Sequence, residues 1–132
     1  MKALVTALRS KLTGDATLMA LVTGVYRNVA PDDATYPCVV LQKLDGSDDY
    51  TLGRRVSTAY TYQARVDVEG GDLDAADDAL ARIDALLTDQ TLTVSGSTVW
   101  VVRRIGDISD YAESQEGRIY QHVGATYSIV LA

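Results

Sequence analysis

The chain changes its hydrophobic period near its middle, and this change constrains the fold more than any other feature. Residues 57–68 alternate between polar and apolar side chains, and the apolar set is Tyr60, Tyr62, Ala64, Val66 and Val68. Such alternation is typical of a strand in an antiparallel sheet with one face in water. After a Gly70-Gly71 break, apolar residues recur at spacings of three and four over residues 72–88, which predicts an amphipathic helix.

The rest of the chain adds further strands and two short helices. Leu4, Val5, Leu8 and Leu12 predict a first helix, and Asp15 is a good N-cap for a second one over residues 16–22. Strands are predicted at residues 25–29, 36–44, 91–94, 98–105 and 118–131, and polar loops at 45–55 and 106–117. Since residues 36–44 are almost continuously apolar, both faces of that strand should be covered.

This order of elements predicts the fold class. We expect an α+β fold in which helices pack on the apolar face of an antiparallel sheet that carries a long exposed hairpin loop. At 132 residues, the whole chain from 1 to 132 is expected to form one domain.

Charge and composition argue against several function classes. The net charge is −6, and adjacent basic residues occur only at Arg54-Arg55 and Arg103-Arg104, so tight nucleic-acid binding is not expected. Apolar runs are too short to span a membrane, and the N-terminus reads as an amphipathic helix rather than a signal peptide. The single cysteine, Cys38, lies in an apolar strand and reads as an inert core thiol.

No motif predicts a catalytic, cofactor or metal site. The one histidine, His122, falls on the polar side of the last strand, without a motif that supplies an acid and a nucleophile. The acidic residues 72–78 lack the oxygen-ligand spacing of a calcium loop, and they suit the N-terminal end of a helix dipole instead. No phosphate-binding glycine loop and no zinc ligand set occurs.

The two long loops are the candidate contact surfaces. Long loops inside a small domain are usually functional or disordered, and each of these carries a tyrosine among polar residues. Arg54 and Arg55 read as contacts to acidic groups of a protein partner, with exposure to solvent or contact with DNA as alternatives. The interface residues that we predict are Tyr50, Leu52, Arg54 and Arg55 in the first loop, and Tyr111 and Glu113 in the second.

The order and spacing of these segments resemble a known family. They are residues 3–12, the Asp15-x-x-Leu18-x-x-Leu21 segment, Val25-Tyr26, Ala30-Pro31, the Tyr36-Pro-x-Val-Val-Leu41 strand, the helix at 72–87 and the closing strand at 122–131. The chain resembles the tail-terminator or tail-completion proteins of long-tailed bacteriophages, which include related head-to-tail joining proteins.

The resemblance implies a virion structural protein without enzyme activity or cofactors, made in the host cytoplasm and built into the tail or neck. Its implied partners are further copies of itself in a six-membered ring, the tail tube protein and the head connector or stopper. Subunits would join head-to-tail around the ring. DNA would pass through the lumen without specific binding.

Three alternative functions stay open at this stage. Within the virion, the alternative is a head-to-tail stopper or a minor tail protein. Outside it, a small cytoplasmic α+β enzyme or ligand-binding protein would need a pocket with convergent polar groups. A nucleic-acid-binding module could use Tyr60 and Tyr62 for stacking, but their apolar neighbours favour burial against a helix.

Overall fold

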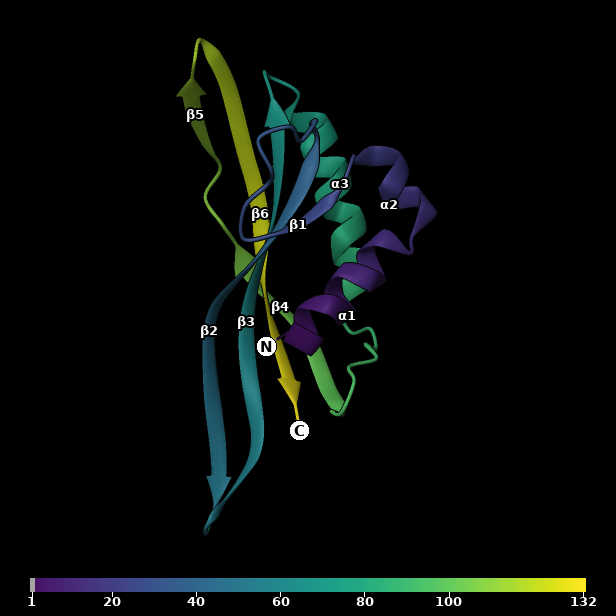
Figure 1. Ribbon diagram of the computed structural model, residues 1–132, viewed down its shortest axis with the longest axis vertical. Coiled ribbons are helices and arrows are strands. Elements are labelled where there is room, and N and C mark those ends of the chain that lie inside the picture. Colours follow the sequence, from purple (N-terminus) through teal and green to yellow (C-terminus); the bar gives the residue numbers. More distant parts are fainter. Residues whose placement is uncertain (1) are drawn as a thin grey trace.

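The structure is a computed structural model that describes residues 2–132. Its strands form one sheet that runs the length of the molecule (Figure 1). The sheet order is β1-β2-β3-β6-β4, and β5 pairs with β6 beside this path. The elements are α1 (Lys2–Thr13), α2 (Ala16–Leu21), β1 (Val25–Arg27), β2 (Cys38–Thr51), β3 (Arg54–Glu69), α3 (Leu73–Leu87), β4 (Val99–Asp107), β5 (Tyr111–Gln115) and β6 (Arg118–Leu131). The predicted α+β fold is therefore confirmed.

The sheet is mixed rather than purely antiparallel. β1 pairs in parallel with β2, with Val25 opposite Val39, whereas all other strand pairs are antiparallel. A parallel pair needs a crossover that returns the chain to the same end of the sheet. Residues 28–37 provide this crossover, so the expectation of an entirely antiparallel sheet was wrong at this one edge.

The three helices lie on one face of the sheet, as predicted (Figure 1). The face of β3 that carries Tyr62, Ala64, Val66 and Val68 is buried beneath them, with each side chain at most 2% exposed. From α1, the residues predicted by helical spacing, Leu4, Val5, Leu8 and Leu12, enter the same core. Burial against helices is thus the role of Tyr62.

The start of β2 is covered on both faces, as its apolar sequence predicted, but only as far as Leu41. Cys38, Val39, Val40 and Leu41 are buried, and every residue from Gln42 to Thr51 is exposed. Burial raises the pKa of the Cys38 thiol to about 11, so the thiol stays protonated near neutral pH. This agrees with its interpretation as an inert core residue.

One predicted strand does not form. Residues 91–94 contribute only an isolated bridge between Val94 and Ser97, because Thr98 pairs with Ala132 instead. Leu92 and Val94 pack against the core from an irregular segment. Their apolar character, which suggested a strand, therefore reflects contact with the hydrophobic core.

An ion pair fastens α2 to α3. Asp15 is the N-cap of α2, as predicted, and accepts a hydrogen bond from the Leu18 amide at 2.8 Å. Arg82 of α3 donates to both carboxylate oxygens of Asp15, at 2.8 and 2.7 Å. The Arg82 guanidinium and the Leu18 amide lower the pKa of Asp15 from 3.8 to about 2.

This depressed pKa predicts an acid-dependent loss of stability. Because the folded state holds the carboxylate ionised, Asp15 stabilises the protein above about pH 4, and this contribution is lost as the pH falls towards about 2. Urea unfolding at pH 2 to 5 should show the wild type losing its advantage over Asp15→Asn, whose side chain still caps α2 but does not titrate. Parallel stability curves for the two proteins would contradict the assignment.

Gly124 of β6 is required by close packing. A Cβ atom there would lie 2.6 Å from the carbonyl oxygen of Ala64 and 3.0 Å from Cδ1 of Ile108. We expect Gly124→Ala to lower the free energy of unfolding by about 1–3 kcal/mol, the usual cost of overpacking. Gly71→Ala is the matched control in chemical denaturation, because a Cβ at Gly71 meets nothing within 4 Å. Equal stabilities of the two variants would refute the prediction.

Candidate interaction surfaces

The first predicted loop, residues 45–55, is instead part of a long β-ribbon. β2 and β3 stay paired from Asp45 opposite Thr61 to Thr51 opposite Arg54, and only Leu52 and Gly53 form the turn. The loop prediction was wrong because it relied on polar composition, whereas a strand with both faces in water needs no apolar alternation. We call residues 45–57 the arm; it projects from the lower end of the sheet in Figure 1.

The outer part of the arm, residues 49–57, is a ribbon of two strands, whereas residues 45–48 pair with the part of β3 that also pairs with β6. β3 pairs with β6 only from Thr58 onwards, so residues 54–57 pair with β2 alone. Within the arm, Arg55 lies 3.7 Å from Asp48, which accepts a hydrogen bond from the Thr58 hydroxyl at 2.7 Å. An isolated two-stranded ribbon is only marginally stable in water. The arm therefore has the character of an element that gains support from a partner.

The four arm residues predicted as contacts all lie at or next to its tip. Leu52 is fully exposed at 104%, Tyr50 is 66% exposed, and Arg54 and Arg55 are exposed as well. Arg54 takes part in none of the ion pairs found among residues 2–132. The tip thus combines apolar side chains with two cationic ones, a mixture that suits a protein interface.

The second predicted loop, residues 106–117, is also largely a strand. β4 continues to Asp107, and β5 pairs with β6 from Tyr111 opposite His122 to Gln115 opposite Arg118, which leaves a short turn at Glu116-Gly117. Here too the polar composition of an exposed edge strand was mistaken for that of a loop. This hairpin forms the upper end of the molecule, opposite the arm (Figure 1).

Tyr111 and Glu113 converge on His122 and lie far from the arm residues. The Tyr111 ring stacks on the His122 ring with centroids 4.3 Å apart, and Glu113 Oε1 lies 3.7 Å from His122 Nε2. Tyr111 remains 40% exposed. The six predicted contact residues therefore form two groups at opposite ends of the sheet.

His122 belongs to a buried polar cluster that sequence reasoning missed. Its Nδ1 lies 2.5 Å from Asp67 Oδ1, and Arg65 donates to the two oxygens of Asp67 at 2.7 and 3.1 Å. Arg65 also donates to the Tyr111 hydroxyl at 3.2 Å. His122 was expected on the polar face of β6, and it is on that face, but it is only 6% exposed because β5 folds over it. The cluster joins β3, β5 and β6.

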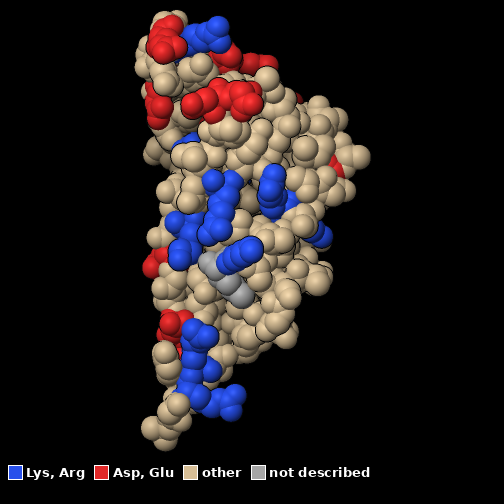
Figure 2. Space-filling model, in the orientation of Figure 1, with Lys and Arg blue, Asp and Glu red and all other residues tan. Residues whose placement is uncertain are grey.

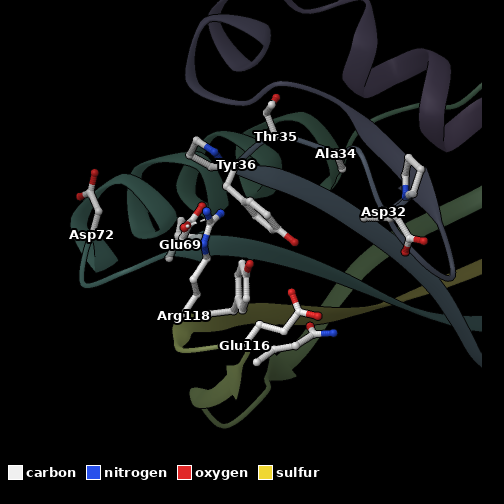
Figure 3. A pocket seen from close by; sticks show the side chains of 14 residues that line it. Asp32, Ala34, Thr35, Tyr36, Glu69, Asp72, Glu116 and Arg118 are labelled. Carbon is white, nitrogen blue, oxygen red and sulfur yellow. Dashed lines mark ion pairs between the residues drawn. The ribbon is translucent and has the colours of Figure 1, made fainter.

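A cavity lies at the upper end of the sheet. Residues 30–37, the end of β3 and the β5–β6 turn line a cavity of about 880 Å³, which we call the cleft. In Figure 3, Tyr36 reaches into it from the crossover, and Arg118 points towards Glu69, with which it pairs at 3.5 Å. Tyr36 packs against Tyr120 with ring centroids 5.1 Å apart. Burial raises the pKa of Tyr36.

Most of the charged residues that line the cleft are carboxylates. Asp32, Glu69, Asp72 and Glu116 line it together with one basic residue, Arg118. Asp32 and Glu116 occur in none of the ion pairs found among residues 2–132. Sequence reasoning could not have found this cleft, because its residues come from segments far apart along the chain.

Charge is divided along the length of the molecule. On the face in Figure 2, the largest acidic group lies at the upper end, while basic side chains gather in the middle and near the lower tip. Among residues 2–132, no group of three or more His, Cys, Asp or Glu side chains is arranged to hold a metal ion. No helix within the same residues is long and apolar enough to cross a membrane.

Comparison with known proteins gives one family and two similar folds. Residues 6–128 match the family model described as tail completion protein gp17. A chain from the virion of a native gene transfer agent particle is 20% identical, with a TM-score of 0.79 over 96% of this chain and 93% of that one. A second solved chain is 16% identical, with a TM-score of 0.57 over 97% and 94%. No curated protein matches the chain.

Proposed function

Because the chain belongs to the tail completion protein gp17 family, a family of non-enzymatic virion structural proteins, we propose that it acts as a tail terminator. In this role the single domain of residues 1–132 assembles with further copies into a six-membered ring. The ring caps the finished tail tube and presents a surface to the head connector or stopper protein. DNA passes through its lumen.

The observation that carries the proposal is the arm. An exposed two-stranded ribbon with Leu52 and Tyr50 in water is unfavourable in an isolated monomer and suits a chain that functions inside an assembly. Tyr111 and Glu113 at the other end of the sheet offer a second contact region. The net charge of −6 supports transit of DNA, since a negative wall repels the phosphate backbone.

Reversing the charge at the arm tip tests this function. Arg54→Glu with Arg55→Glu should leave the monomer folded, because both side chains are exposed, but should impair assembly of the virion. Circular dichroism would confirm the fold, and light scattering would give the mass of the protein alone and with isolated tail tubes. Normal virion assembly by this double variant would remove the arm from the proposed interface.

The wild-type mass tests the ring itself. A six-subunit particle in solution, or a monomer that becomes one on tube ends, is the expected result. A chain that remains monomeric and does not bind tubes would overturn the terminator role and favour a stopper or minor tail protein.

A further inference from the structure

We propose that the arm tip of one copy of this chain docks into the cleft of the next copy. This inference rests on the proposed function, because it names the partner that the arm meets in the ring. It is carried by the complementarity of two surfaces that the fold places at opposite ends of one sheet (Figure 1). Among residues 2–132, Arg54 of the arm and Asp32 and Glu116 of the cleft take part in no ion pair within the same copy.

The arm tip supplies an apolar side chain and two cations. Leu52 is fully exposed at the turn, with Arg54 and Arg55 immediately behind it. Arg55 is held by Asp48 at 3.7 Å, a long and solvent-exposed pair that a better partner can replace. Arg54 has no such pair among residues 2–132, so its guanidinium is available to a second molecule.

The cleft supplies the matching groups. Its Ala30, Pro31, Ala34 and Pro37 provide apolar surface for a leucine side chain. The Tyr36 and Tyr120 rings offer aromatic faces that attract a guanidinium. The carboxylates of Asp32 and Glu116, which form no ion pair within residues 2–132, can accept its hydrogen bonds. Figure 3 shows Asp32 and Glu116 on different sides of the hollow, with Tyr36 between the elements that carry them.

The placement of the two surfaces determines the kind of assembly. A tip that enters the cleft of another copy makes a heterologous contact, since the two copies use different surfaces. Each copy then has one occupied cleft and one engaged arm. Repetition of this contact gives a closed ring if the rotation closes, which is the architecture that the proposed function requires.

The decisive experiment mixes two assembly-deficient variants. The arm variant is Arg54→Glu with Arg55→Glu, and the cleft variant is Asp32→Arg with Glu116→Arg. Each alone is expected to remain monomeric in light scattering under conditions where the wild type assembles, in solution or on tail tubes. An equimolar mixture should recover assembly with the two variants alternating, because the intact arm of the cleft variant fits the intact cleft of the arm variant and the reversed arm fits the reversed cleft. One chain carrying all four changes should recover assembly.

Two controls carry the same changes of charge on other surfaces. Lys2→Glu with Arg103→Glu matches the arm variant, and Asp77→Arg with Asp78→Arg matches the cleft variant; all four positions are exposed. Both controls should assemble like the wild type. Loss of assembly in the controls would mean that net charge, rather than docking, governs the contact, and would overturn the inference.

The outcomes separate this inference from the proposed function. If the wild type assembles and caps tubes while the cleft variant does the same, the arm does not use the cleft; the inference fails and the terminator role stands. If the mixture does not assemble although each variant alone is folded and monomeric, the pairing of arm with cleft is likewise refuted. If the wild type neither assembles nor binds tubes, the proposed function fails, and this inference fails with it.

Discussion

Asp67→Ala should lower the free energy of unfolding by about 3 kcal/mol, one of the largest effects that we expect from a single substitution in this protein. Asp67 is 4% exposed and is the common partner of Arg65 and His122. Removing it leaves a half-buried guanidinium and a buried imidazole without their acceptor, and breaking a buried ion pair costs about 3–5 kcal/mol. We expect the lower end because the Arg65 side chain keeps 21% of its surface exposed.

Glu69→Ala is the matched control for this prediction. Glu69 lies on the same strand and also pairs with an arginine, Arg118, but the two side chains are 41% and 67% exposed. An exposed pair contributes at most about 1 kcal/mol, so this variant should unfold close to the wild type in urea. If both variants lost the same free energy of unfolding, burial of the cluster around Asp67 would not explain the destabilisation by Asp67→Ala.

The elements of the core could be predicted from sequence because burial imposes a period. The alternation from Tyr60 to Val68 and the helical spacing of Leu4, Leu8 and Leu12 each reflect one buried face, and the structure buries these faces. The N-cap at Asp15 followed from local chemistry alone. In these segments, the sequence pattern and the tertiary contacts have the same physical origin.

The contact surfaces could not be predicted in the same way. In residues 45–55 no face is buried, so no alternation marks the strands, and acidic side chains made a ribbon resemble a loop. His122 was expected to be exposed to solvent, because Tyr111, which packs over its ring, comes from another strand. The cleft depends on the meeting of the crossover, the end of β3 and the β5–β6 turn. Such surfaces arise from tertiary structure, which leaves little periodic trace in a single sequence.

Shortening the arm should abolish assembly while leaving the fold intact. Replacing residues 50–56 by Asn-Gly joins Asp49 directly to Ser57, its partner in the register, through a two-residue turn that favours hairpins. All seven deleted residues are exposed, so little apolar surface leaves the core. The free energy of unfolding should change by less than about 1 kcal/mol.

We expect the shortened chain to lose assembly completely, because the deletion removes every contact of the arm tip at once. Leu52, Arg54 and Arg55 are absent from the shortened chain, whereas the cleft and the cluster around His122 remain. Light scattering should therefore find a folded monomer that neither forms rings nor caps tail tubes.

Mixed with wild-type protein, the shortened chain should still offer its cleft to an intact arm, and so end growing assemblies before they close. A shortened chain that assembles normally would show that the arm is dispensable. The contact between copies would then have to lie on the body of the sheet.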